Sequence, residues 1–180
     1  MKVSLVMPTI NVTTELDLFL KSLKAQTYKD FELIVVDQNE GNEVFEIVKD
    51  YEEDFKIKYV KSDEKGLSLN RNRGLILMKG EIVGFPDDDC EYSPDTLEKV
   101  VAFFERKKNY RIYSCRTLER GKDYGTGVME KKDTEITKDS VDTTVKSITF
   151  FVNYGKDDIV LFDENLGVGA SFGSGEETDY

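Results

Sequence analysis

The sequence contains no histidine, and this absence excludes every mechanism that depends on an imidazole. Acid–base catalysis would have to use carboxylates, lysine, tyrosine or cysteine. A conventional zinc site would also lose its histidine ligands, whereas oxygen-rich sites for Mg²⁺ or Mn²⁺ stay open.

Cysteines and long apolar runs are also scarce. Cys90 and Cys115 are the only cysteines, and they fit reduced structural thiols better than a disulfide framework. No apolar run approaches the roughly 20 residues that span a bilayer. The N-terminus runs directly into a strand-like segment and lacks the layout of a signal peptide. We therefore expect a cytoplasmic protein, with no membrane association indicated within this chain.

Positive charge is in deficit, with 25 Lys and Arg against 36 Asp and Glu and a net charge of −11. A basic footprint is what nonspecific nucleic-acid binding needs, so we expect no nucleic-acid partner. If the ligand is an anionic phosphate, the protein must supply a local cation. A metal ion held by carboxylates would do so.

What is present indicates one globular domain, because 180 residues and 39% hydrophobic content suffice for a buried core. Short apolar runs alternate with helical stripes. Strands are predicted at residues 2–7, stopped by a proline, at 31–36, around 57–59, at 81–85 and at 112–115. Helices are predicted from a capping box at Thr14 and Asp17, at 44–51, at 67–78 and from Ser93. This order predicts an α/β fold with an open, mainly parallel sheet.

The pattern weakens after Thr117. Residues 117–144 are polar and glycine-punctuated, which indicates an exposed excursion, and apolar character returns at 145–152 and 159–162.

Three polar clusters follow predicted strands: residues 8–11, 37–39 and 87–89. Parallel strands would bring them to one edge of the sheet, where ligands of such folds bind. The strongest cluster is Asp87-Asp88-Asp89, because three adjacent acids repel one another unless a cation neutralises them. Hard divalent cations take carboxylate oxygens and share them with substrate phosphates. The alternative is a solvated acidic loop before a helix N-terminus.

Residues 65–74 form a basic stretch near the same edge. Arg71 and Arg73 are suited to hold phosphate or a base edge by forked hydrogen bonds. The alternative is two arginines on the exposed face of a helix, and spacing alone does not separate the two.

The order of these pieces resembles the nucleotide-binding half of family-2 inverting glycosyltransferases with the GT-A fold. The matching parts are Pro8 with Asn11, the run from Gln26 to Asp37, Gly66 with Arg71, Asn72 and Gly74, and the run from Gly80 to Val83. The likeness is dense to about Leu97 and sparse across residues 117–160.

The resemblance implies a Rossmann-like, mainly parallel sheet flanked by helices, with a short antiparallel addition in the C-terminal part. It implies one GT-A catalytic domain over residues 1–180. Residues 1–97 would bind the nucleotide sugar, and residues 98–180 would form an incomplete acceptor-side half. Family members continue beyond the point that matches Tyr180, so the resemblance also predicts a truncated chain whose activity is in doubt.

The resemblance also implies roles for single residues. Pro8 and Asn11 would shape the nucleotide site; Thr9, Asp37 and Arg71 would contact the nucleobase, and Asp88 the ribose. Asp89 would ligate Mn²⁺ or Mg²⁺ at the donor diphosphate, with Asp87 as a second ligand. Glu177 would be the catalytic base, with Glu176 and Asp179 as alternatives. A helix-terminal acidic pair after a glycine turn is the other interpretation of Glu176 and Glu177.

Three positions depart from the family pattern. Gln38 follows Asp37 where a second acid is frequent, Asn70 replaces the usual alanine, and Glu177 replaces the commoner aspartate.

The resemblance, together with the ordered motifs at the strand ends, implies a metal-dependent inverting glycosyltransferase that moves a sugar from a nucleotide donor to a glycan or lipid-linked acceptor. A UDP-sugar is the favoured donor, but the residues alone do not identify the base or the sugar. A noncatalytic nucleotide- or glycan-binding domain is the alternative. A sugar-nucleotide pyrophosphorylase is disfavoured, because residues 8–11 lack the glycine-rich basic loop that it needs after the first strand.

Overall fold

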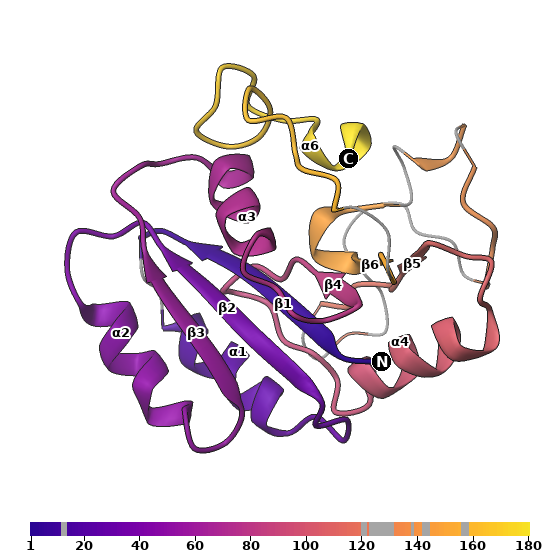
Figure 1. Ribbon diagram of the computed structural model, residues 1–180, viewed down its shortest axis with the longest axis horizontal. Helices are drawn as coiled ribbons and strands as arrows, with labels where there is room; N and C mark the ends of the chain where they lie inside the picture. The colour runs from indigo at the N-terminus through magenta and orange to yellow at the C-terminus, as the bar shows by residue number, and fades with distance from the viewer. Residues whose placement is uncertain (12–13, 120–121, 123–131, 138, 142–144, 156–158) are drawn as a thin grey trace.

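The computed structural model describes residues 1–11, 14–119, 122, 132–137, 139–141, 145–155 and 159–180. Six strands form one sheet in the order β3-β2-β1-β4-β6-β5 (Figure 1). Their bounds are β1 Val3–Thr9, β2 Phe31–Asp37, β3 Lys56–Lys61, β4 Ile82–Gly84, β5 Ile112–Ser114 and β6 Phe150–Asn153. The first four strands pair in parallel, whereas β6 runs antiparallel to both β4 and β5. The predicted parallel sheet and its antiparallel addition are both confirmed.

The helices lie in two layers on either side of this sheet (Figure 1). They are α1 Glu15–Lys24, α2 Glu43–Val48, α3 Leu67–Leu75, α4 Thr96–Arg106 and α6 Glu176–Asp179, with short 3-10 turns η1 Lys49–Tyr51 and η2 Ser147–Thr149. One apolar cluster joins α1, α2 and α4 to one face of the sheet. A second cluster joins α3 and the C-terminal segment to the other face.

Strand β1 supplies both clusters because its side chains alternate between the two faces. Leu5 and Met7 belong to the cluster under α1, whereas Val6 belongs to the cluster under α3. Helix α3 packs closely on this second face, since a Cβ atom on Gly74 would lie only 2.3 Å from Cγ1 of Val6. A glycine here lets the helix backbone, and with it Arg71, approach the sheet.

Strand β1 does not stop at Pro8, as the sequence predicted, but continues to Thr9. The backbone N–H of Val3 donates its hydrogen bond on the β2 side of β1. The backbone C=O of Thr9 accepts from the N–H of Gln38 on the same side. Backbone groups of successive residues in a strand point to opposite sides, so the position where Pro8 lacks an N–H faces β4. Pairing with β4 has already ended at Leu5, and no ladder hydrogen bond is lost there.

Of two predicted helix starts, the one at Thr14 is confirmed without its capping bond, and the one after Ser93 is corrected. Thr14 makes no capping bond to the α1 backbone; its hydroxyl donates to Glu15 instead, over 3.2 Å. Helix α4 begins at Thr96 rather than directly after Ser93, and its first turn is satisfied from outside. The Gln26 amide accepts from Leu97 N–H at 3.1 Å and donates to the Ser93 carbonyl at 2.8 Å.

Helix α3 ends at Leu75, earlier than the predicted residue 78. Beyond it the chain turns so that the backbone N–H of Lys79 donates to Glu32 at 2.7 Å and that of Gly80 to Ser4 at 2.8 Å. The expected exposed excursion at residues 117–144 lies largely outside the described residues. Among the helices that are described, none combines the length and apolarity needed to cross a bilayer.

Candidate functional site

The three polar clusters meet at the carboxyl edge of the parallel strands. Thr9 at the end of β1 is in register with Asp37 at the end of β2. The Thr9 hydroxyl donates to the Asp88 carboxylate, which joins the first cluster to the third. The backbone N–H of Asn11 donates to Oδ1 of Asn39 at 2.7 Å, which joins the first cluster to the second. The predicted ligand edge is therefore a connected set of contacts.

Asp37 lies at the centre of one corner of this edge, and its side chain has no exposed surface. Its Oδ2 accepts from the Tyr59 hydroxyl at 2.5 Å and from Lys61 Nζ at 2.9 Å. Its Oδ1 accepts from the backbone and side-chain N–H groups of Asn39 at 2.9 and 2.7 Å. Burial alone would raise the pKa of Asp37, but these donors together lower it. A ligand meets Lys61 and Asn39 before it reaches Asp37.

The three aspartates of the acidic turn after β4 differ in their exposure to solvent. Asp87 and Asp88 are half-buried and Asp89 is exposed. Burial, opposed by Arg71 but reinforced by the neighbouring acids, raises the pKa of Asp87 to about 6. Burial likewise raises the pKa of Asp88, against the hydrogen bond from Thr9. The turn therefore holds more negative charge than its surroundings compensate.

This donor set fits a shared rather than a self-contained metal site. Within the described ranges, no group of three or more acidic or cysteine side chains is arranged around one point. A dication bound together with a diphosphate needs only one or two protein carboxylates, since phosphate oxygens and water supply the rest. Asp87 and Asp89 offer such a pair. Burial is the main cause of the raised pKa of Asp87, and a cation there would offset the repulsion from the neighbouring acids that adds to it.

Arg71 links the acidic turn to the end of the chain. It is 1% exposed, with Nη2 at 3.8 Å from Oδ1 of Asp87 and Nη1 at 3.4 Å from Oε1 of Glu176. The guanidinium carbon lies 5.3 Å from the centroid of the Phe162 ring and 5.9 Å from that of Phe85. Burial lowers its pKa, against the neighbouring carboxylates. The geometry directs this cation toward two carboxylates.

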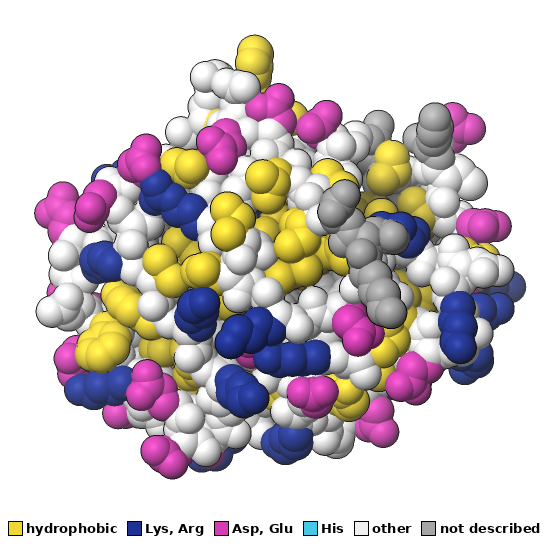
Figure 2. Space-filling view, viewed as in Figure 1, with side chains coloured by type: hydrophobic (Ala, Val, Ile, Leu, Met, Phe, Trp, Pro, Cys, Tyr) yellow, Lys and Arg dark blue, Asp and Glu magenta, His cyan; other side chains and the backbone are white. Residues whose placement is uncertain are grey.

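Helix α6 places the candidate bases differently. Glu176 is buried against Arg71, Glu177 is half-buried, and Asp179 is exposed. Burial and the charge of Glu176 raise the pKa of Glu177, against its own backbone hydrogen bond and the charge of Arg71. Gly175 at φ 100° precedes the helix, as the glycine-turn interpretation expected. Figure 2 shows acidic side chains gathered at the top of this face, where the C-terminal segment lies.

The C-terminal segment is fixed to α3 by side chains of the basic stretch. Asn72 donates to the Phe162 carbonyl at 3.0 Å and accepts from the Phe162 N–H at 2.8 Å. Ser68 donates to the Leu166 carbonyl at 2.7 Å. Arg73 points elsewhere, to Ser62 and Glu64. Of the two arginines, Arg71 thus belongs to the site and Arg73 does not.

Two departures from the family pattern have structural roles. Oε1 of Gln38 accepts from the backbone N–H of Gly66 at 2.9 Å and so holds the start of α3. Asn70 is fully buried and donates to the carbonyls of Gly66 and Glu64, at 2.8 and 3.0 Å. Both amides fix the loop that leads into the helix bearing Arg71.

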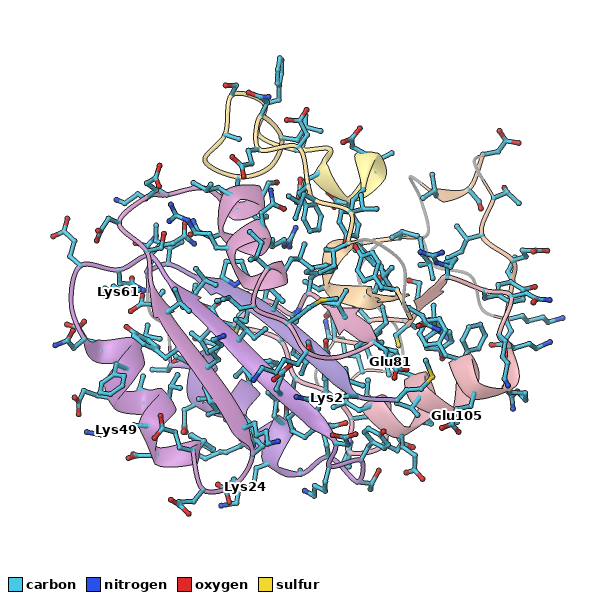
Figure 3. The ribbon with its side chains drawn as sticks, in the orientation of Figure 1. Lys2, Lys24, Lys49, Lys61, Glu81 and Glu105 are labelled. Carbon is cyan, nitrogen blue, oxygen red and sulfur yellow. The ribbon has the colours of Figure 1, made fainter. Side chains whose placement is uncertain are left out.

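Sequence reasoning missed Tyr59 and Lys61 as parts of this site. The alternation of Ile57 and Tyr59 predicted a strand, but nothing in it indicated that the side chains of Tyr59 and Lys61 converge on Asp37. Figure 3 shows Lys61 at the carboxyl end of β3. The register of Asp37 with Lys61 was the missing information.

Several known proteins are similar to this chain in sequence. It is 31% identical over 143 residues to the GalNAc(5)-diNAcBac-PP-undecaprenol beta-1,3-glucosyltransferase of Campylobacter jejuni, covering 76% of this chain and 46% of that protein. It is 30% identical over 135 residues to the poly(ribitol-phosphate) beta-N-acetylglucosaminyltransferase TarP of Staphylococcus aureus, covering 72% of this chain and 41% of TarP. The chain thus spans under half the length of these two relatives.

Solved structures share the fold. TarS 1-349 of S. aureus matches with a TM-score of 0.81 at 24% identity, over 99% of this chain and 53% of that one. A mannosyltransferase of Pyrobaculum calidifontis, solved with GDP-Man and Mn2+, matches with a TM-score of 0.69 at 20% identity, over 94% of this chain and 50% of that one. These likenesses confirm the GT-A fold. The family model described as "Glycosyl transferase family 2" matches residues 4–153, and the chain therefore belongs to glycosyltransferase family 2.

Proposed function

We propose that the protein transfers a sugar from a nucleoside diphosphate donor to an acceptor hydroxyl, with inversion at the anomeric carbon. The observation that carries this proposal is the position of Arg71, which contacts both Asp87 of the acidic turn and Glu176 of α6. The Arg71 guanidinium thereby holds the acidic turn, whose carboxylates suit a metal-bound diphosphate, beside α6, whose carboxylates suit deprotonation of an acceptor. TarS, which shares the fold, is solved in complex with UDP and with UDP-GlcNAc, and a UDP-sugar is the donor we propose here.

The nucleoside would lie along the contacts that join the strand ends. We assign Pro8, Thr9 and Asn11 to the turn that holds it, Asp37 to the nucleobase corner, and Asp88 to the ribose. The hydrogen bond between Thr9 and Asp88 supports the placement of base and ribose side by side. Arg71 would reach the donor from between its two carboxylate partners, so its part in base contact is secondary to holding Asp87 and α6.

Asp89 and Asp87 would hold Mn²⁺ or Mg²⁺. The bound ion would supply positive charge for the departing diphosphate in a protein whose net charge is −11. Arg71 adds a fixed positive charge beside the same turn. The chain's own contribution is thus to gather carboxylates at the point where an anionic ligand needs a cation.

Glu177 is the residue we assign as the general base. Glu176 is paired with Arg71, whereas Glu177 is half-buried, and its burial raises its pKa, the direction that makes a carboxylate a better proton acceptor. It would take the proton of the acceptor hydroxyl as that oxygen attacks the anomeric carbon, while the bond to the diphosphate oxygen breaks. A positioned base contributes roughly 10²- to 10⁴-fold to the rate.

Residues 1–97 would bind the donor, and residues 98–180 would contribute the acceptor side. The second part is not a separate folding unit, because β6 and β5 extend the sheet from β4. A glycan or lipid-linked acceptor and a cytoplasmic location are further parts of the proposal. The names of the C. jejuni and S. aureus relatives refer to an undecaprenol-linked and a poly(ribitol-phosphate) acceptor, and they support this acceptor class.

Calorimetric titration with UDP, GDP and CDP, each with and without Mn²⁺, tests the donor site. We expect at least one diphosphate to bind, and more tightly with Mn²⁺; no binding by any of them would overturn the proposal. A panel of UDP-sugars with candidate acceptors then tests transfer. Binding of the donor without any transfer would favour the noncatalytic alternative.

A further inference from the structure

We infer that the face of the sheet on which α3 packs carries a docking surface for an anionic lipid bilayer. This surface has a basic patch beside an apolar patch. The basic patch consists of Lys2, Lys56, Lys58 and Lys79, and the apolar patch of Ile76, Val160 and Leu161. The inference names a partner of the protein and so goes beyond the proposed function.

The four lysines of the basic patch are gathered around one carboxylate, that of Glu32. Nζ of Lys2 lies 2.9 Å from Oε2 of Glu32, and the backbone N–H of Lys79 donates to Oε1 at 2.7 Å. Lys56 is the partner of Glu32 in the β2–β3 register, and Lys58, two residues later, points to the same face. Figure 2 shows Lys and Arg side chains gathered below α3 on this face.

This patch has an excess of positive charge in a chain whose acids outnumber its bases by 36 to 25. Lys56, Lys58 and Lys79 are exposed, and none of the three forms an ion pair within the part of the chain that the structure describes. Glu32 already pairs with Lys2. Glu81, at the margin, lies beside Lys2, whose carbonyl accepts from its N–H at 3.0 Å (Figure 3). Four lysines thus face two glutamates.

Protection of the sheet edge does not account for this arrangement. Lysines on an edge strand commonly prevent pairing with other chains, and Lys56 and Lys58 on β3 would serve that purpose. Lys2 and Lys79, however, lie outside β3. Nothing in the sequence indicated a membrane surface, because the four lysines are dispersed over residues 2–79 and only strand pairing brings them together.

The apolar patch borders the basic patch at the end of α3. Ile76 is 70% exposed, and Val160 and Leu161 are 50% and 49% exposed. Asn72, one turn before Ile76, holds the backbone of Phe162 by hydrogen bonds of 3.0 and 2.8 Å, so the segment leading into Phe162 runs beside this helix end. The basic patch begins again three residues after Ile76. Figure 2 shows hydrophobic side chains exposed directly above the basic ones.

The combination favours a bilayer over a soluble anion. Charge alone would suffice for a soluble anion, whereas apolar side chains beside ammonium groups match the boundary between anionic headgroups and hydrocarbon. Acidic side chains farther than about 10 Å from the headgroups are largely screened at about 0.1 M salt, so the local charge decides. The acidic side chains at the top of this face oppose a bilayer there, which confines contact to the end where β1, β2 and β3 begin (Figure 2).

Co-sedimentation with lipid vesicles in about 0.1 M NaCl tests the surface. Vesicles of phosphatidylcholine alone are compared with vesicles that contain about 30% phosphatidylglycerol, which is anionic. We expect the protein to bind the anionic vesicles, and to bind them less tightly as the salt concentration rises. Equal binding to both kinds of vesicle, or binding to neither, would overturn the inference.

A triple variant, K56Q/K58Q/K79Q, tests the basic patch. Each lysine near an anionic surface corresponds to about a 5-fold change in affinity, so the three together should weaken vesicle binding on the order of 100-fold. If the triple variant does not fold, K58Q alone should show the 5-fold loss, and unchanged binding by K58Q would then overturn the inference.

The matched control is K21Q/K24Q/K49Q, which changes the net charge by the same amount. Its three exposed lysines lie on α1 and η1, on the opposite side of the sheet. We expect this variant to bind the anionic vesicles as the wild type does. An equal loss in both triple variants would show that only the total charge matters, which contradicts a local surface.

I76Q tests the apolar patch. Removal of a largely exposed apolar side chain that enters the bilayer should weaken vesicle binding by about 5- to 30-fold and leave its salt dependence unchanged. Unchanged affinity in I76Q would contradict the inference, because charge alone would then hold the protein.

Light scattering over a range of protein concentrations tests the other occupant, a second copy of the chain. A dimer that the wild type forms and K56Q/K58Q/K79Q loses would assign this face to contact between copies and overturn the inference. A monomer in both cases supports it. None of these measurements uses a nucleotide, so they decide on the surface independently of donor binding.

Discussion

Nη1 of Arg71 lies 3.4 Å from Oε1 of Glu176, although 105 residues separate the two in the sequence. On its other side the same guanidinium faces Asp87 at 3.8 Å. Helix α6, which carries Glu177, is thus held against the acidic turn by one buried cation. Tyr180 adds to this attachment, because its ring stacks on Phe162 with the centroids 3.9 Å apart.

R71M should destabilise the fold more than R73M does. Arg71 is 1% exposed and its loss leaves Glu176 buried without its cation, so we expect a cost of about 3 kcal/mol or more. Arg73 pairs with Glu64 at a more exposed position, where such pairs contribute up to about 1 kcal/mol. Urea unfolding of both variants measures the difference. Equal costs would show that Arg71 does not hold α6.

D89N should abolish the part of UDP binding that depends on Mn²⁺. The exposed Asp89 carboxylate is one of the two ligands proposed for the ion, and an amide is a weaker ligand for a hard dication. Titration of UDP with and without Mn²⁺ measures the effect. D30N is the control, because Asp30 lies just before β2, at the opposite end of the strand from Asp37. Unchanged Mn²⁺ dependence in D89N would remove Asp89 from the metal site.

E177Q should leave donor binding intact and lower the rate of transfer by about 10²- to 10⁴-fold. The reason is that glutamine keeps the size of the side chain but cannot take the acceptor proton. The measurements are UDP-sugar affinity and the transfer rate, each compared with D179N, which removes an exposed carboxylate of the same helix. Retained transfer in E177Q together with loss in D179N would make Asp179 the base.

The stability of the protein should depend on pH through Glu32. Burial tends to raise the pKa of this carboxyl, but hydrogen bonds from Lys2, Ser4 and the Lys79 backbone lower it overall. A lowered pKa in the folded state means that the stabilisation is complete above roughly pH 5 and is lost as the pH falls through the folded-state pKa. Urea unfolding from pH 7 to pH 3 should show this loss in the wild type.

E32Q should flatten that dependence, because an amide does not titrate. At neutral pH it should cost about 1–3 kcal/mol, the typical contribution of hydrogen bonds to a charged group. E53Q, which changes an exposed carboxylate in the turn before β3, should follow the wild-type curve. An E32Q curve as steep as that of the wild type would place the acid sensitivity elsewhere.

The sequence predicted the helices and strands well, because the spacing of apolar residues within each element shows which of its side chains are buried. The stripe of Leu16, Phe19, Leu20 and Leu23 predicted α1, and all four side chains are buried. The apolar run ending at Asp37 predicted a strand covered on both faces, as β2 is. Helix caps were predicted less well. Thr14 offered a local signal but makes no capping bond. The side chain that caps the α4 N-terminus is Gln26, which lies 71 residues away from Leu97.

The sequence by itself determined the α/β alternation, the antiparallel addition through its resemblance to family 2, and the placement of three polar clusters at strand ends. Only the tertiary structure decided how their side chains are paired: Arg71 with Asp87 and Glu176, and Asp37 with Tyr59 and Lys61. The physical reason is that burial follows from the local pattern of apolar residues. The partner of a buried polar group depends instead on strand register and on which distant segments pack against it.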